Sequence, residues 1–192
     1  MNFHIIIDHP WKDSFNYAVL DSFISGIENN HHSFDLLDLN RTDFNPIMSE
    51  LELANYSKGI SIDPKIKDHQ ARLLKTDHLV LIFPIWWNVM PARLKGWMDK
   101  VLLPGFAFST DQVPVPMLSH IQGATIFTTT GTPDEYHRKE FNNALEWVLC
   151  KGTLEFCGIR PTKWFNFGDT GFVDRSVHSA WLENIKNLAM KF

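Results

Sequence analysis

The sequence predicts an α/β fold in which five parallel strands form one sheet in the order 2-1-3-4-5, with helices on both faces. Short apolar, β-rich segments alternate with longer segments whose apolar residues recur at helical spacing, which is typical of parallel sheets. The run HLVLIFPI is continuously apolar, as a strand covered on both faces must be. Because crossovers between parallel strands are right-handed, few strand orders remain.

The expected strands are short and rich in β-branched and aromatic residues. In chain order they are FHIIID (3–8), SFDLLDL (33–39), HLVLIFPI (78–85), GATIFTTT (123–130) and PTKWFNFG (161–168). Residues 40–62 are polar and irregular, and we expect a loop there.

Capping residues mark the ends of the expected helices. Ser14 and Asp174 are N-cap residue types before the first and the last helix. Pro64 and Pro91 stand at the start of the second and third helices, where proline is tolerated. The expected helices cover residues 14–27, 63–77, 91–103, most of 136–157, and 174–192.

Composition and charge narrow the class of protein. The chain has 192 residues, of which 44% are hydrophobic and 21% charged, which predicts a single globular domain over residues 1–192. A net charge of −4 gives no basic field for nucleic acid or anionic lipid. Cys150 and Cys157 form no CxxC pair, the longest apolar run is too short to span a bilayer, and we find no signal peptide. We therefore expect reduced thiols and a cytoplasmic protein without a membrane segment.

Ligands of such sheets bind outside the carboxyl ends of the strands, near the switch point between strands 1 and 3. The loops to examine are 8–16, 84–90, 128–136 and 168–175. Neither GxGxxG nor a P-loop motif occurs in the chain, so a classical dinucleotide fold is unsupported. In the first loop, Asp13, Ser14 and Asn16 either cap the following helix or, with its free N–H groups, hold a pyrophosphate.

Two further loops carry aromatic or hydroxyl groups. Side chains alternate along a strand, so one of Trp86 and Trp87 is expected to pack inward and the other to form a flat wall for a ligand. The alternative is that both seal the core. After strand 4, TTTG offers hydroxyls, and Tyr136 and His137 could stabilise negative charge on a ring that accepts electrons. Alternatively, Tyr136 only caps a helix and His137 is solvated.

Four segments carry a resemblance to a known family: HPWKDSFNYA, FPIWWNVMPARLKGWMDKVLLPGFAF, TTTG…Y and TLEFCGI. They resemble the flavodoxin-like NAD(P)H:quinone oxidoreductases, the DT-diaphorase group and its bacterial relatives. The segments occur in the same order and span nearly the whole chain, and the second is the most specific. The resemblance implies a flavin-dependent enzyme, usually a homodimer with both active sites at the interface.

The resemblance also implies a reaction and the residues that would carry it out. Two electrons would pass from NADH or NADPH, through FAD or alternatively FMN, to a quinone or similar flat acceptor by a ping-pong mechanism. Tyr136 and His137 would be catalytic. Trp87, Phe106 and Phe108 would contact the acceptor. Trp86, Phe106 and Phe108 are also expected to be exposed aromatic residues that a partner subunit covers. No metal ligand is implied. The cofactor-binding residues would be His9, Asp13, Ser14, Phe15, Asn16, Pro84, Ile85, Trp86, Trp87, Asn88, Thr129, Thr130, Gly131, Tyr136 and Arg175.

The chain departs from the family pattern at three places. Thr132 follows Gly131 where a second glycine is usual, and Asn142 stands near the place of the family's active-site histidine. Asp13 replaces a hydroxyl residue, so its backbone N–H is the expected phosphate contact. Two alternatives remain: a regulatory ancillary subunit of a potassium-efflux transporter, and an electron-transfer flavodoxin. The modest net charge and HPWKDSFN argue against the flavodoxin.

Overall fold

The computed structural model describes residues 1–192 and contains one sheet of five strands in the predicted order, β2-β1-β3-β4-β5. All four pairs of neighbouring strands are parallel. Each strand begins and ends within one residue of its predicted range. The strands are β1 (Asn2–Ile7), β2 (Ser33–Asp38), β3 (His78–Pro84), β4 (Ala124–Thr129) and β5 (Thr162–Phe167).

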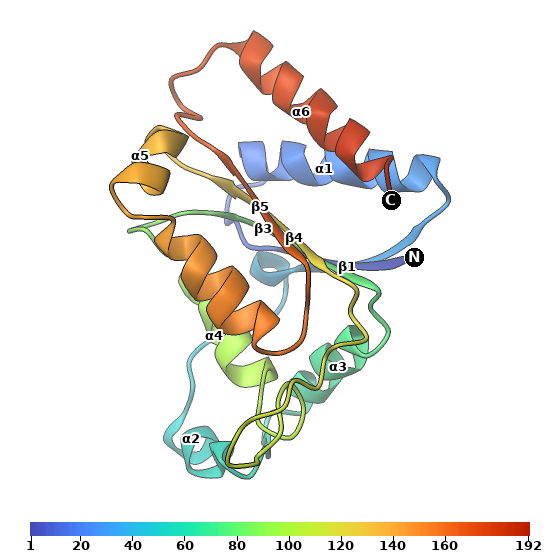
Figure 1. The fold of residues 1–192 in the computed structure, drawn as a ribbon, viewed down its shortest axis with the longest axis vertical. Helices are drawn as coiled ribbons and strands as arrows, with labels where there is room; N and C mark the ends of the chain where they lie inside the picture. The colour runs from blue at the N-terminus through green and yellow to red at the C-terminus, as the bar shows by residue number, and fades with distance from the viewer.

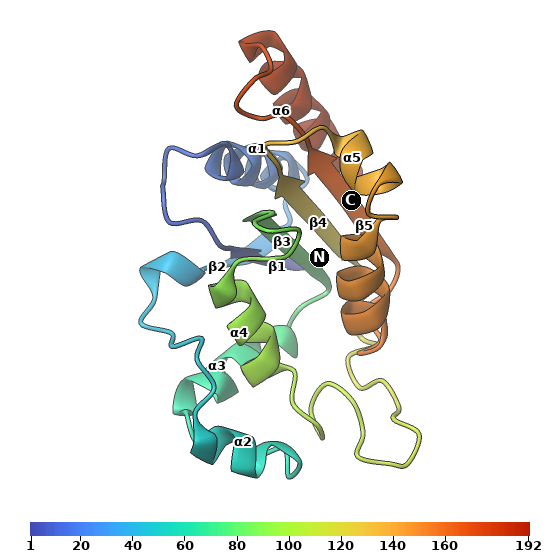
Figure 2. The same ribbon diagram turned by 90° about the vertical axis from the view of Figure 1, so that its left-hand side faces the viewer.

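Helices cover both faces of the sheet, as Figures 1 and 2 show. Helices α1 and α6 pack together on one face, and α3, α4 and η2 lie on the other. The helices are α1 (Phe15–Asn29), η1 (Leu39–Arg41), α2 (Glu50–Tyr56), α3 (Pro64–Leu73), α4 (Ala92–Val101), α5 (Asp134–Lys139), η2 (Glu146–Glu155) and α6 (Arg175–Ala189).

Alternation of side chains along the strands divides the core into two layers. In β1, Phe3, Ile5 and Ile7 face α1 and α6, whereas Ile6 belongs to the layer beneath α3 and α4. Every residue of β3 is buried, as predicted for a central strand. In Figure 1 both chain termini lie at the right-hand end of the sheet, and α5 lies near the opposite end, where the strands finish.

The segment 40–62 is not only a loop, because it contains η1 and α2. A capping box starts α2: the Ser49 hydroxyl accepts from the Glu52 N–H at 3.3 Å, and the Glu52 carboxylate accepts from the Ser49 N–H at 2.7 Å. The buried ammonium of Lys100 on α4 pairs with Glu52 at 2.8 Å. Gly96 permits this docking, since a Cβ there would lie 2.2 Å from the Pro46 carbonyl oxygen.

The helix expected over most of 136–157 is interrupted in the middle. Asn142 and Asn143 have φ of 48° and 55°, in the left-handed region that asparagine tolerates better than most residues. Helix α5 therefore ends at Lys139, and the chain resumes as η2, which is wound as a π-helix. Such helices are rare and are often found at functional sites.

The two cysteines are buried and unbonded, as expected. Burial raises the pKa of the Cys150 and Cys157 thiols to about 11, so both remain protonated at neutral pH. None of the helices combines the length and the apolar character that a membrane crossing requires.

Candidate active site

Three of the predicted loops meet at the carboxyl edge of the sheet. The Ile85 N–H donates to the Thr129 carbonyl at 2.9 Å, which continues the β3–β4 pairing past the strand. The Asn16 side-chain amide donates to the Thr129 hydroxyl at 2.9 Å. Residues from the starts of α1 and of the loops after β3 and β4 are thus brought together, as the fold predicts.

The first turn of α1 contains two buried polar atoms without a partner. Ser14 is the N-cap, yet its hydroxyl makes no hydrogen bond. The Asn16 side-chain oxygen is also buried and unpaired. An unpaired buried polar group costs about 1–3 kcal/mol, and the free N–H groups of a helix start favour anions. These atoms fit a phosphate-bearing ligand better than they fit a purely structural cap.

The neighbouring predicted residues have different surroundings. His9 is partly buried, its ring nitrogen accepts from the Trp11 N–H at 3.1 Å, and burial lowers its pKa. Asp13 is exposed. The Phe15 ring stacks on His178 of α6, with ring centres 4.6 Å apart, so it also packs α1 against α6.

The two tryptophans do not alternate along a strand, because β3 ends at Pro84. Trp86 and Val89 exchange backbone hydrogen bonds of 3.0 and 3.1 Å, and Trp87 and Asn88 between them have φ of 51° and 63°. This is the backbone of a two-residue hairpin turn. Trp86 is 45% exposed beside His9, and Trp87 is 96% exposed. Neither indole packs inward, so the expectation that one of them would and the alternative that both seal the core are both wrong.

Hydrogen bonds from the loop that follows β5 hold the loop after β4 in place. The Thr130 carbonyl accepts from the Thr170 N–H and hydroxyl, at 3.1 and 3.2 Å. Thr129 and Thr130 are buried, and Gly131 is exposed. A Cβ at Gly131 would meet nothing within 4 Å, so packing within the chain does not require glycine there. The open space leaves room for a flat ligand against the backbone.

Tyr136 and His137 lie side by side on α5 but face different surroundings. His137 is buried and its ring hydrogen-bonds the Thr132 hydroxyl at 3.0 Å, so the alternative of a solvated histidine is wrong. Burial lowers the pKa of His137, which favours the neutral ring. Tyr136 is 45% exposed, packs edge-on against Phe141, and its hydroxyl has no partner in the chain.

The remaining predicted residues lie around this edge or beyond it. Arg175 is exposed at the first position of α6. Phe106 and Phe108 are partly buried rather than exposed, because both pack against the core layer beneath α4. Phe108 contacts Phe156, which directly follows η2, and lines a cavity of about 220 Å³ between α4 and η2.

Asp8, directly after β1, is a site residue that was not predicted from the sequence. Its buried carboxylate accepts from the Leu94 N–H at 2.8 Å and from the Asn40 side chain at 2.6 Å. Burial raises the pKa of Asp8. The carboxylate thereby fixes the start of α4, which directly follows the tryptophan turn. A polar residue ending an apolar strand at the switch point was the available signal.

Comparison with known proteins places the chain in a family. The family described as having a flavodoxin-like fold matches residues 1–189. A protein of Haemophilus influenzae named an uncharacterized NAD(P)H oxidoreductase is 32% identical over 185 residues, covering 95% of this chain and 91% of the relative. The chain belongs to the flavodoxin-like NAD(P)H:quinone oxidoreductase family. NAD(P)H dehydrogenase (quinone) 1 of Cavia porcellus is 26% identical, covering 96% of this chain and 76% of that protein.

A solved structure agrees with this family assignment. Smu.1420 from Streptococcus mutans UA159 superposes with a TM-score of 0.88 at 28% identity, with both chains fully covered. The resemblance seen in the four sequence segments is thus confirmed for the fold and the family. The chain is an oxidoreductase of this family.

Proposed function

We propose that the protein is a flavin-dependent enzyme that transfers two electrons from NAD(P)H to quinones or similar flat acceptors. The observation that carries the proposal is the pair of unpaired buried atoms at the start of α1, the Ser14 hydroxyl and the Asn16 side-chain oxygen. They lie at the switch point of the sheet, where this fold binds ligands. The names of the relatives support a nicotinamide donor and a quinone acceptor.

Different residues of the carboxyl edge would bind different parts of the flavin. The N–H groups at the start of α1 would hold the flavin phosphate, with Ser14 and Asn16 completing its hydrogen bonds. The loop from Pro84 to Asn88 and the backbone at Gly131 would flank the flat ring. When bound, a flavin would supply the hydride chemistry, and the chain would supply orientation and charge stabilisation. The free Tyr136 hydroxyl is the donor proposed to stabilise developing negative charge.

One face of the ring would serve the two substrates in turn. The exposed indole of Trp87 and the half-exposed indole of Trp86 offer apolar surface for a flat molecule at the mouth of the site. Donor and acceptor would then exclude one another, which predicts parallel lines in double-reciprocal plots of initial rate. Intersecting lines would contradict a shared position.

The released cofactor tests the proposal most directly. We expect the purified protein to be yellow and to release FAD on heating, identified by mass spectrometry. A colourless preparation that takes up neither FAD nor FMN would overturn the proposed function. Release of FMN alone would overturn only the choice of FAD, which depends on the loop HPWKDSFN.

A further inference from the structure

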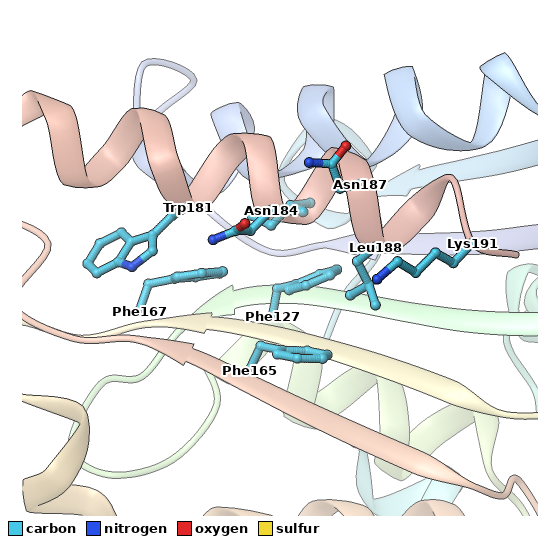
Figure 3. A pocket seen from close by; sticks show the side chains of 9 residues that line it. Phe127, Phe165, Phe167, Trp181, Asn184, Asn187, Leu188 and Lys191 are labelled. Carbon is cyan, nitrogen blue, oxygen red and sulfur yellow. The ribbon is translucent and has the colours of Figure 1, made fainter.

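A second cavity runs along α6, from Trp181 near the carboxyl edge to Lys191 near the other end of the helix. It has a volume of about 390 Å³ and lies between α6 and the face of β4 and β5 that α6 covers, as Figure 3 shows. The lining residue Leu188 follows Arg175 by 13 positions, which corresponds to about 20 Å of helix. The volume is within the range of small-molecule sites in proteins. We call this cavity the α6 groove.

The floor of the α6 groove is flat and aromatic. Phe127 of β4 lies nearly parallel to Phe165 and Phe167 of β5, with interplanar angles of 26° and 17°. Trp181 of α6 tilts against Phe167, with ring centres 5.3 Å apart, and forms one end of the groove. Phe127 and Phe167 are themselves buried, so the rings that a planar apolar body could cover are the partly exposed Phe165 and Trp181.

The rim of the α6 groove is polar, and its side chains are free to bind a ligand. Asn184, Asn187 and Lys191 follow one another at helical spacing above the floor. Their side chains make no hydrogen bond or ion pair within the chain, and Figure 3 shows the Lys191 ammonium turned back toward Leu188. Lys163 of β5, by alternation on the same face as Phe165, adds a second unpaired cation.

We propose that the α6 groove binds a small amphipathic anion with a flat apolar body and a single carboxylate. The partly exposed rings of Phe165 and Trp181 match the body, and Lys191 matches the carboxylate, with the two asparagine amides as further donors. A neutral apolar ligand would leave these polar groups unused. The proposed function does not require this site, since none of its lining residues is among those proposed to bind the flavin, although Phe167 at one end contacts Phe15.

Isothermal titration with 2-naphthoate tests the proposal, with 2-naphthamide as the uncharged ligand of the same shape. We expect one molecule of 2-naphthoate per chain, tighter binding than the amide, and quenching of fluorescence from Trp181. Lys191→Met should weaken 2-naphthoate binding about three- to fivefold, as expected for one exposed charge pair, and leave 2-naphthamide binding unchanged. Asn187→Glu, at an exposed helical position, should weaken it similarly by repulsion.

Lys67→Met is the matched control, because Lys67 is an exposed lysine on α3, on the other face of the sheet. Its affinity for 2-naphthoate should equal that of the wild type. Absence of binding at millimolar 2-naphthoate, or equal affinities in wild type, Lys191→Met and Asn187→Glu, would overturn the proposal. Loss of binding in the presence of saturating FMN would also overturn it, since the ligand would then occupy the carboxyl-edge site.

Discussion

Ser14 is a residue at which folding and ligand binding impose opposite demands. Its buried hydroxyl has no partner in the chain, so removing it relieves a buried unpaired group. We expect Ser14→Ala to raise the free energy of unfolding of the flavin-free protein by about 1 kcal/mol. The same change should weaken flavin binding about 5- to 30-fold, because it removes a hydrogen bond of about 1–2 kcal/mol. Chemical denaturation and flavin titration measure the two effects.

Ser49→Ala is the matched control, because the Ser49 hydroxyl does form its cap at the start of α2. This change should lower the free energy of unfolding by about 1 kcal/mol and leave flavin affinity unchanged. If Ser14→Ala instead behaves like Ser49→Ala, Ser14 is an ordinary cap and not a ligand contact.

The Tyr136 hydroxyl has no partner in the chain, so Tyr136→Phe removes a donor without breaking an internal bond. We expect NAD(P)H to be oxidised about 10- to 100-fold more slowly in a stopped-flow experiment, if the hydroxyl contributes about 1.4–2.7 kcal/mol in the transition state. Flavin affinity and thermal stability should change little. An unchanged rate constant with lower stability would mean that Tyr136 only packs against Phe141.

Among the elements, α4 depends on a side chain from a distant strand. Helix α4 begins after Pro91 without a side-chain cap of its own, and the Asp8 carboxylate accepts from Leu94 N–H instead. Asp8→Ala would leave that N–H and the Asn40 amide without their acceptor. We expect a loss of about 2–4 kcal/mol in the free energy of unfolding, measured by denaturation in urea. A loss below about 1 kcal/mol would show that water replaces the carboxylate.

The strands could be predicted closely because their signal is local. A run such as 78–85 must be buried on both faces, and its burial and length leave little choice of structure. Helix α2 was missed although Ser49 and Glu52 form a capping box, because its helix buries no residue and shows no apolar stripe. The break at Asn142 was missed because a left-handed asparagine has no distinct sequence signal.

The location of the candidate site could be predicted from the sequence, but its detailed geometry could not. Strand order alone brings Asn16, Ile85 and Thr129 together, and the structure confirms their contacts. The tryptophan turn was mistaken for strand because two successive positive φ values are unusual outside Gly, Asn and Asp. Asp8 was missed because its role depends on Leu94, which is 86 residues away.

At the scale of the whole molecule, His78 couples stability to pH. Burial, with a smaller effect of Lys163, lowers the pKa of His78 to about 4, and its ring hydrogen-bonds the Thr125 hydroxyl at 2.9 Å. The unfolded chain therefore binds this proton first, near pH 6.5, so stability is lost as the pH falls from about 6.5 toward 4. At pH 4.5 the loss is about 2.5 kcal/mol.

His78→Gln tests this coupling because glutamine does not titrate. The difference in free energy of unfolding between pH 7 and pH 4.5 should be smaller in the variant by about 2.5 kcal/mol. Equal differences in the two proteins would show that His78 titrates normally in the folded state.

The last prediction concerns assembly, which follows from the apolar surface around η2. Trp147 and Val148 are 65% and 62% exposed, and Phe156 is 43% exposed. Val148 and Phe156 line the same cavity as Met90, which directly follows the tryptophan turn. An exposed apolar surface of this kind is typical of an interface, and closed two-fold symmetry is the commonest arrangement. We therefore propose a homodimer through η2, which would cover the mouth of the active site.

Sedimentation at micromolar concentration should show a dimer for the wild type and a monomer for Val148→Glu. Leu74→Glu is the matched control, because Leu74 is equally exposed at 60% but lies at the end of α3, away from η2. Val148 lines a cavity with Met90, which directly follows the turn that carries Trp86 and Trp87, so the Val148→Glu monomer should also lose quinone reduction while it keeps bound flavin. A wild-type monomer with flavin bound would contradict the dimer, and a fully active Val148→Glu monomer would show that each site is complete within one chain.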